Sequence, residues 1–217
     1  EQLARIITGR ENGRLSRTVA KSFLDAGWRV KAISRSGKSL PELTGAEFIA
    51  ADAQDKNALV RATQGAEVIF NGLNPLYTEW EEKALPMARH ALAAAKAHKA
   101  TMLFPGNVYG YGAGMPQDLV ETTQEHPTTR KGEIRVEMEA LFRDAAEQDG
   151  VQTIILRAGD FFGGTGSGTW VDLMFVTKLY KGVFNHPGNP DTMHAFAYLP
   201  DLADAFVIAA QKRGELG

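Results

Sequence analysis

The sequence contains no cysteine, which excludes disulfide bonds, iron–sulfur clusters and a thiolate nucleophile. Reducing compartments favour such a composition, so we expect a cytoplasmic protein. Apolar runs are also short, and none approaches the roughly 18 residues that a membrane-spanning helix needs. The first residues lack the charged and apolar regions of a signal peptide. We therefore expect no association with a membrane.

An excess of either charge is missing too, since 24 Lys and Arg residues face 26 Asp and Glu residues. The net charge is −2 and no basic block occurs, so we expect no nucleic-acid partner. The five histidines show no metal-ligand spacing, and the helical pair His90 and His98 lies more than two turns apart. We predict no metal site. A Gly-x-Ser-x-Gly sequence, which marks many hydrolase nucleophiles, is also missing.

What the sequence does contain is a regular alternation of short apolar runs and amphipathic stretches. Its 217 residues, 44% of them hydrophobic, predict one domain over residues 1–217. Strands are predicted at Ile6 and Ile7 and at residues 28–34, 47–52, 66–73, 101–104 and 153–157. Helices are predicted after Ser16 and at residues 56–63, 79–99, 132–149 and 202–212. Pro86 is expected either to kink the helix over 79–99 or to mark its restart. This alternation predicts an α/β fold with a doubly wound parallel sheet.

A glycine-containing turn follows the first strand. Gly9 and Gly13 come after Ile7, and helical spacing begins after Ser16. Dinucleotide-binding βαβ units begin in this way, because small residues let backbone N–H groups and the helix dipole approach a pyrophosphate. An ordinary βα turn that binds no ligand is the alternative for this stretch alone.

Three further motifs follow in order: Val108-Tyr109-Gly110, Leu156-Arg157-Ala158-Gly159-Asp160, and the stretch over residues 194–203. With the glycine turn, they resemble the extended short-chain dehydrogenase/reductase family, which comprises NAD(P)-dependent epimerases and dehydratases. The resemblance spans nearly the whole chain and implies a Rossmann fold. It places Gly13 and Ser16 at the second and third glycines of the family's loop, so a hydroxyl stands where the family has a glycine.

The resemblance implies that a dinucleotide lies across the carboxyl ends of the strands. Gly72 is expected to keep the backbone low beneath the cofactor ribose. The residues expected to contact the cofactor are Gly9, Arg10, Gly13, Arg14, Leu15, Ser34, Arg35, Ser36, Asp52, Ala53, Asn71, Gly72, Leu73, Pro105, Gly106 and Gly159.

The end of the second strand bears on the choice between NAD and NADP. An acidic side chain at this position accepts a hydrogen bond from the ribose 2′-hydroxyl of NAD, but no acidic residue occurs between Val30 and Pro41. Arg35 offers a planar, permanently charged fork that suits the 2′-phosphate of NADP. We expect NADP(H) to be preferred to NAD(H). A solvated arginine at a strand end is the alternative.

Reductases and epimerases of this family use a Tyr with a Lys four residues later on one helix. Matching Val136 and Glu137 to that helix places Thr129 and Glu133 at the two positions, so the pair is missing. An amide at Asn107 could still donate a hydrogen bond to a carbonyl oxygen. The remaining candidates for catalysis are Asn107, Tyr109 and Lys131, with Tyr77 near the same strand ends.

Residues 163–200 are expected to contribute to a small and incomplete C-terminal substrate lobe, with a helix over 171–180 and strands over 182–185 and 193–198. Asp201 is placed to cap the last helix. We expect a small-molecule substrate and consider a homodimer.

Two functions stay open. One is an oxidoreductase or epimerase with substituted catalytic groups, acting on a carbonyl or sugar-nucleotide-like substrate. The other is a non-catalytic NADP-binding sensor or regulator.

Overall fold

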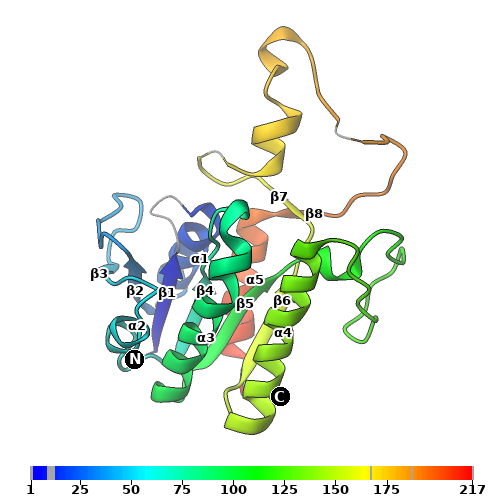
Figure 1. Ribbon diagram of the computed structural model, residues 1–217. Helices are drawn as coiled ribbons and strands as arrows, with labels where there is room; N and C mark the ends of the chain where they lie inside the picture. Colours follow the sequence, from blue (N-terminus) through cyan, green and yellow to red (C-terminus); the bar gives the residue numbers. More distant parts are fainter. Residues whose placement is uncertain (1, 9–12, 167, 187, 217) are drawn as a thin grey trace.

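A parallel β-sheet forms the centre of the molecule. The computed structural model describes residues 2–8, 13–166, 168–186 and 188–216. The sheet has six strands in the order β3-β2-β1-β4-β5-β6, and all neighbours are parallel (Figure 1). The strands are β1 (Leu3–Thr8), β2 (Arg29–Ser34), β3 (Glu47–Ala50), β4 (Val68–Gly72), β5 (Thr101–Gly106) and β6 (Thr153–Arg157). The chain returns from the edge strand β3 to β4 beside β1, which confirms the predicted doubly wound fold.

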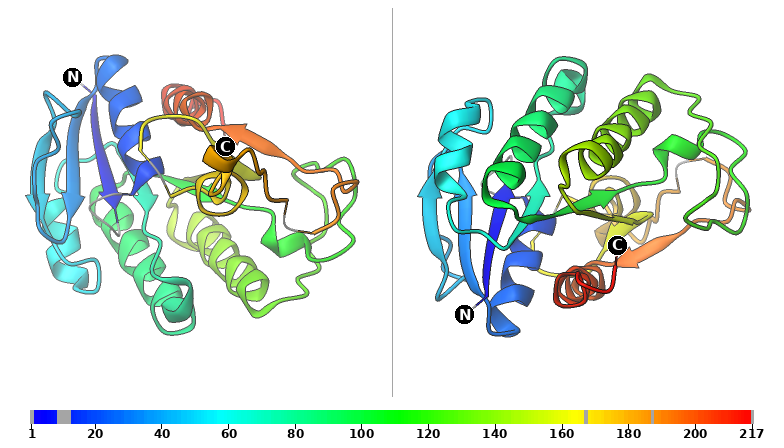
Figure 2. Two further views of the ribbon diagram at one scale, coloured as in Figure 1. Left: turned by 90° about the horizontal axis from the view of Figure 1, so that it is seen from above. Right: turned by 90° about the horizontal axis from the view of Figure 1, so that it is seen from below.

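Helices cover both faces of the sheet (Figure 2). On one face lie α1 (Arg14–Asp25) and α5 (Leu199–Gln211), and on the other α2 (Lys56–Ala62), α3 (Trp80–His98) and α4 (Arg130–Asp149). Buried aromatic rings fix each layer: Phe70 meets Phe206 of α5 at 5.0 Å between centroids, and Phe104 meets Phe142 of α4 at 4.5 Å. None of the helices in the described ranges is long and apolar enough to cross a membrane.

The two long helices on the second face differ in detail from their predictions. α4 begins at Arg130, two residues before the predicted start, because Thr129 acts as its N-cap. The Thr129 hydroxyl oxygen accepts a hydrogen bond from the Gly132 N–H at 3.1 Å. In α3, Pro86 lies inside one continuous helix, so the helix does not restart there.

The start of α5 corrects another prediction. The helix begins at Leu199, with Tyr198 in the N-cap position, so the predicted N-cap role of Asp201 is wrong. Pro200 explains the earlier start, since its fixed φ suits the first helical turn and no N–H is needed there. Asp201 instead places a negative charge in the first turn, where the helix dipole favours it.

After β6 the chain leaves the sheet. β7 (Asp160–Phe162) pairs in parallel with β8 (Phe196–Tyr198). The described residues between them, 163–166, 168–186 and 188–195, form an arm that extends from the carboxyl edge of the sheet (Figure 1). Instead of the predicted helix over 171–180, the arm has a π-helical turn, Val171–Phe175, and a 3-10 turn, Leu179–Lys181. Residues 182–185 are irregular, and the strand predicted over 193–198 is limited to β8.

Exposure explains these corrections in the arm. Tyr180 and Met193 are 81% and 82% exposed, so the apolar residues that suggested regular elements are largely unburied. Short helices and strands gain most of their stability from packing an apolar face against another element, and the arm buries few of its own apolar side chains.

Candidate active site

The site lies at the switch point of the sheet, where the connections that follow two neighbouring strands turn to opposite faces. β1 leads into α1 on one face and the neighbouring β4 leads into α3 on the other, which opens a crevice at their carboxyl ends. Asn71 and Gly72 of β4 pair with Ile7 and Thr8 of β1. The Asn71 Oδ1 atom accepts a hydrogen bond from the Leu73 N–H at 3.2 Å. Its buried Nδ2 atom has no partner within the part of the chain that the structure describes. A buried donor of this kind is available to a ligand.

The first turn of α1 points its N–H groups towards the same crevice. Gly13 is the N-cap residue and has no side chain to bond these groups, and the turn contains no acid. A helix terminus of this composition suits a phosphate. Gly9 and Arg10, which are also expected to contact the cofactor, lie outside the described residues.

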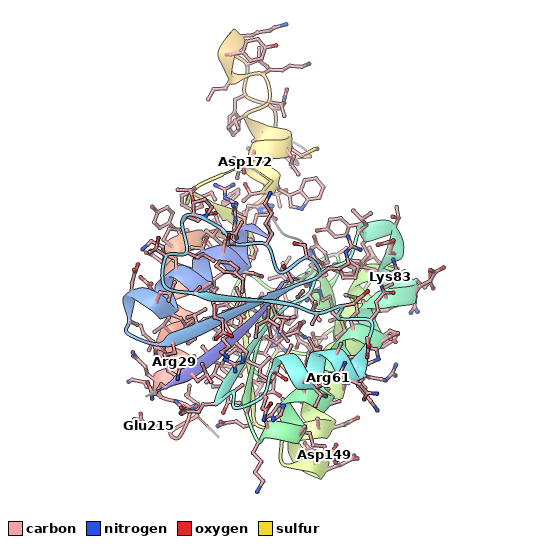
Figure 3. The ribbon with its side chains drawn as sticks, turned by 90° about the vertical axis from the view of Figure 1, so that its left-hand side faces the viewer. Arg29, Arg61, Lys83, Asp149, Asp172 and Glu215 are labelled. Carbon is pink, nitrogen blue, oxygen red and sulfur yellow. The ribbon has the colours of Figure 1, made fainter. Side chains whose placement is uncertain are left out.

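The Arg14 side chain ties the start of α1 to the arm. Its guanidinium pairs with the Asp172 carboxylate and donates a hydrogen bond to the Gly163 carbonyl at 2.6 Å. Asp172 lies at the base of the arm (Figure 3). It also accepts hydrogen bonds from the Thr169 N–H at 2.9 Å and hydroxyl at 2.7 Å. The buried Nε atom of Arg14 has no partner among the described residues.

Gly72 and Ser16 fit one another. A Cβ atom on Gly72 would lie 2.0 Å from the Ser16 hydroxyl oxygen and 2.8 Å from the Ile7 carbonyl oxygen. Ser16 is 4% exposed and occupies the position where the family's loop has its third glycine. The missing side chain at residue 72 therefore makes room for the hydroxyl on α1. This packing requirement explains Gly72 without the cofactor ribose that the sequence suggested.

The turn after β2 carries the residues expected at a 2′-phosphate. The Ser34 hydroxyl accepts a hydrogen bond from the Gly37 N–H at 3.0 Å, and the Ser36 hydroxyl accepts one from the Lys38 N–H at 3.1 Å. Each hydroxyl keeps its own proton to donate. Arg35 and Lys38 are exposed beside them, so two cations and two hydroxyls meet in one short turn.

Other residues predicted at the cofactor are fixed by the fold. The Ala53 carbonyl accepts a hydrogen bond from His90 Nδ1 of α3 at 2.8 Å. The exposed Asp52 carboxylate accepts one from the Gln54 N–H at 2.9 Å. Both contacts shape the loop after β3, which passes beside the turn after β2.

The remaining residues of the predicted cofactor set lie in or beside the core. Leu15 and Leu73 pack into the apolar layers on opposite faces of the sheet. At the end of β5, the Pro105 carbonyl accepts a hydrogen bond from Arg135 Nη1 at 3.3 Å, and the Gly106 carbonyl accepts one from the Ala158 N–H at 3.3 Å.

A cleft of about 630 Å³ opens beside the ends of β4 and β5. It lies between the start of α3, the start of α4, the 3-10 turn Tyr109–Tyr111, and Trp170 of the arm. The lining residues are Tyr77, Thr78, Trp80, Glu81, Tyr109, Thr129, Arg130, Lys131, Ile134 and Trp170. Two of the three predicted catalytic residues, Tyr109 and Lys131, thus come together in one cleft.

Two tyrosines and a lysine meet in the cleft. The hydroxyls of Tyr77 and Tyr109 lie 3.3 Å apart. Burial and then this hydrogen bond raise the pKa of Tyr109, so its phenol stays protonated at neutral pH. The Lys131 ammonium lies 4.8 Å from the centroid of the Tyr77 ring. The arrangement presents a hydrogen-bond donor and a cation to a ligand in largely aromatic surroundings.

The third candidate, Asn107, supports Tyr109 through the backbone. Its Oδ1 atom accepts a hydrogen bond from the Tyr109 N–H at 3.0 Å. This contact forms a short turn at the end of β5 and holds the following 3-10 turn in place.

The start of α4 shows where the residues assigned to the Tyr and Lys positions lie. Thr129 precedes the helix as its N-cap, and Glu133 points to solvent, 3.1 Å from Arg130. Lys131 lines the cleft, and Arg135, four residues later, lies over the Trp80 ring beside it. Thr129 therefore lines the cleft from the N-cap position, whereas Glu133 does not line it.

Sequence reasoning missed Trp80, Arg135 and Trp170. The Arg135 guanidinium lies 4.8 Å from the Trp80 ring centroid, and burial lowers its pKa. The four-residue spacing of Lys131 and Arg135 was the signal available in the sequence. Trp170 carried none, because it reaches the cleft from the arm.

A buried ion pair joins α4 to β6 below the cleft. Glu139, only 2% exposed in its side chain, accepts hydrogen bonds from Arg157 Nε at 3.0 Å and Nη2 at 2.5 Å. Arg157 Nη1 also donates to the Tyr111 hydroxyl at 3.0 Å. The pair therefore anchors the 3-10 turn that carries Tyr109.

Comparisons with known proteins agree with this architecture. The UDP-glucose 4-epimerase of Brucella ovis, solved in complex with NAD, is 16% identical and has a TM-score of 0.82 over 100% of this chain and 75% of its own. The L-threonine dehydrogenase of Clostridium difficile is 20% identical, with a TM-score of 0.79 over 97% of this chain and 71% of its own. These likenesses show a shared fold. No curated protein matches the sequence.

A match to a family model identifies the family, which fold similarity alone does not. Residues 6–216 match the NAD dependent epimerase/dehydratase family, which confirms the resemblance seen in the sequence motifs. The match covers the crevice, the cleft and the arm. The chain belongs to the NAD-dependent epimerase/dehydratase family.

Proposed function

We propose that this protein binds NADP(H) in the crevice and performs reduction, oxidation or epimerisation at a carbonyl or sugar-nucleotide-like substrate held in the cleft. The observation that carries the proposal is the pair of hydrogen-bonded phenols, Tyr77 and Tyr109, beside Lys131 at the ends of β4 and β5. The epimerase and the dehydrogenase that share this fold support the reaction class.

The residues present fit a dinucleotide. The uncapped first turn of α1 at Gly13 suits the pyrophosphate, and the unpartnered Nδ2 atom of Asn71 suits a polar group at the floor of the crevice. Arg35, Ser34 and Ser36 suit a 2′-phosphate. The cofactor, when bound, supplies or accepts the hydride.

The chain's own groups act on the substrate oxygen. Tyr109 keeps its proton at neutral pH and donates a hydrogen bond to that oxygen, which stabilises the negative charge that develops there. Lys131 adds a positive charge to the same cleft. Trp80, Ile134 and Trp170 give the cleft apolar walls, which strengthen both interactions once a substrate covers them.

Replacing Arg35 by Asp should reverse the cofactor preference. The substitution removes the charged donor and adds an acid that can bind the ribose hydroxyls of NAD. A lost charged hydrogen bond is worth about 1.5–3 kcal/mol, so NADPH should bind roughly 10–100-fold more weakly. Calorimetric titration with NADPH and NADH measures both affinities. Arg143→Asp, at an exposed position on α4, is the control and should leave the NADPH affinity unchanged. Equal affinity of the original protein for the two cofactors would contradict the NADP preference.

A non-catalytic NADP-binding sensor is the second candidate. It is favoured by one observation: the residues that the start of α4 presents to the cleft include no tyrosine, which the family's reductases and epimerases need on this helix. These residues are Thr129, Arg130, Lys131 and Ile134. Such a sensor would bind NADPH without reducing any carbonyl. The two candidates therefore differ in turnover and share cofactor binding.

A further inference from the structure

Trp170 is the residue through which the arm reaches the cleft. It stands in the N-cap position of the π-helical turn Val171–Phe175 and is 42% exposed. The other described residues that line the cleft lie in or beside α3, α4 and the 3-10 turns Tyr77–Glu79 and Tyr109–Tyr111. A wall of the cleft that belongs to the arm needs an anchor of its own, because the arm lies outside the central sheet.

The Asp172 carboxylate closes the chain around Trp170. Its Oδ2 atom accepts hydrogen bonds from the Gly168 N–H at 3.1 Å, the Thr169 N–H at 2.9 Å and the Thr169 hydroxyl at 2.7 Å. These donors precede Trp170 in the chain, and their acceptor follows it. The backbone on both sides of Trp170 is therefore tied to one oxygen atom, in a turn where Thr169 is only 7% exposed.

Arg14 of α1 holds this oxygen in place. Its Nη1 atom pairs with Asp172 Oδ2, and its Nη2 atom donates hydrogen bonds to the carbonyls of Gly163 at 2.6 Å and Gly164 at 3.3 Å. The side chain of Arg14 is 9% exposed and that of Asp172 is 28% exposed, so removing one partner leaves a largely shielded charge without its counterion. One guanidinium thus connects the core helix α1 with the turn that carries Trp170.

The base of the arm is fixed by separate contacts. A Cβ atom on Gly159 would lie 2.1 Å from the Ala195 carbonyl oxygen, so the outgoing and returning chains approach closely at a residue that the resemblance placed at the cofactor. The Asp160 N–H donates a hydrogen bond to the same carbonyl at 3.0 Å. At the far end of the π-helical turn, Phe175 packs against Phe196 of β8 at 6.1 Å between ring centroids. None of these three contacts includes Trp170, so its position depends on the network around Asp172.

We propose that Trp170 binds the substrate as a wall of the cleft and that Asp172, held by Arg14, is the positioning residue that keeps Trp170 there. The proposal rests on the proposed function. The indole of Trp170 adds apolar contact area, which stabilises the bound substrate and the transition state alike. Asp172 acts through Trp170, since its contacts are made within the base of the arm and with α1.

Acrylamide quenching of tryptophan fluorescence reports on Trp170 without turnover. The chain has three tryptophans, and Trp28 and Trp80 are each only 3% exposed, so the quencher mainly reaches Trp170. Asp172→Asn keeps the size of the side chain and removes its charge. The quenching constant should rise up to about twofold, the ratio of a fully exposed indole to one that is 42% exposed. Trp170→Phe should remove most of the quenching, which identifies its source. Asp191→Asn, at an exposed position in the same arm, should leave it unchanged.

A double variant tests whether Arg14 and Asp172 act as one pair. Arg14→Gln breaks the ion pair and also removes the hydrogen bonds to the carbonyls of Gly163 and Gly164. Adding Asp172→Asn should therefore raise the quenching constant no further than Arg14→Gln alone. Additive increases would contradict a shared role of the two residues.

The substrate role of Trp170 is measured by steady-state kinetics at saturating NADPH. The substrate is a carbonyl compound that the original protein reduces, chosen from aldehydes, ketones and sugar nucleotides. Trp170→Ala should raise KM about 10-fold and leave kcat within about threefold, because a wall of this kind contributes equally to both bound states. Trp170→Phe keeps an aromatic ring and should recover most of the loss. Asp172→Asn should raise KM in the same way, whereas Asp191→Asn should not.

The possible outcomes distinguish this proposal from the proposed function. If the original protein reduces a carbonyl and Trp170→Ala keeps its KM, Trp170 does not bind the substrate and the proposed function stands. An unchanged quenching constant in Asp172→Asn would overturn the positioning role of Asp172. A lower urea midpoint for that variant, with quenching and KM unchanged, would show that the ion pair with Arg14 only stabilises the fold. Tight NADPH binding without turnover on any carbonyl would overturn the proposed function and the substrate role of Trp170 together.

Discussion

Arg157→Met should destabilise the protein by about 3–5 kcal/mol, the cost typical of breaking a buried ion pair from one side. The Glu139 carboxylate, only 2% exposed, would lose the guanidinium that donates to it at 2.5 and 3.0 Å. A methionine side chain fills much of the same space but leaves the negative charge without a partner. Urea-induced unfolding followed by circular dichroism measures the loss, and Arg143→Met, at an exposed position on α4, is the matched control.

A double variant distinguishes the charge from the packing. Adding Glu139→Gln to Arg157→Met removes the stranded charge and should recover part of the lost stability. If Arg157→Met costs less than about 1 kcal/mol, the range of an exposed ion pair, the carboxylate is not buried as described. The same result would remove the anchor that we assign to the turn carrying Tyr109.

Tyr109→Phe should lower kcat about 10²-fold or more, since a single oriented donor to a developing oxyanion contributes this much. Burial raises the pKa of this phenol, so it is protonated below that pKa and keeps its donor proton across neutral pH. Loss of the hydroxyl removes that donor and also the contact with Tyr77 at 3.3 Å. Cofactor affinity should stay the same, because the ring and its packing remain.

The matched control for this variant is Tyr180→Phe, which removes the same hydroxyl from an 81% exposed position in the arm. It should keep full activity. Turnover of Tyr109→Phe within a factor of a few of the original protein would show that this phenol does not hold the substrate oxygen.

The central sheet could be predicted because its signals are local. Each strand is a short apolar run, and a predicted amphipathic helix follows most of them, so the alternation predicted the doubly wound sheet. The arm could not be predicted in the same way. Its apolar residues, such as Tyr180 and Met193, form a pattern that normally indicates burial, but they are exposed. A pattern of residue types says nothing about whether a partner surface exists.

The site was predictable only in part, because its residues meet through tertiary contacts. The sequence placed Tyr109 and Lys131 among the catalytic candidates, and the structure brings both to one cleft. The start of α4 was predicted at residue 132, whereas Thr129 caps the helix and Arg130 begins it. The fit between the Ser16 hydroxyl and Gly72, whose missing side chain makes room for it, could not be predicted either. The two residues lie far apart in the chain and come close only in the folded protein.

The most direct test of the account is turnover of the original protein with NADPH. The panel of aldehydes, ketones and sugar nucleotides is offered, and both the loss of reduced nicotinamide and the alcohol product are measured. We predict that at least one carbonyl is reduced, with one NADPH consumed for each alcohol formed. Tight binding of NADPH without reduction of any of these carbonyls would contradict the account and identify the protein as a non-catalytic sensor.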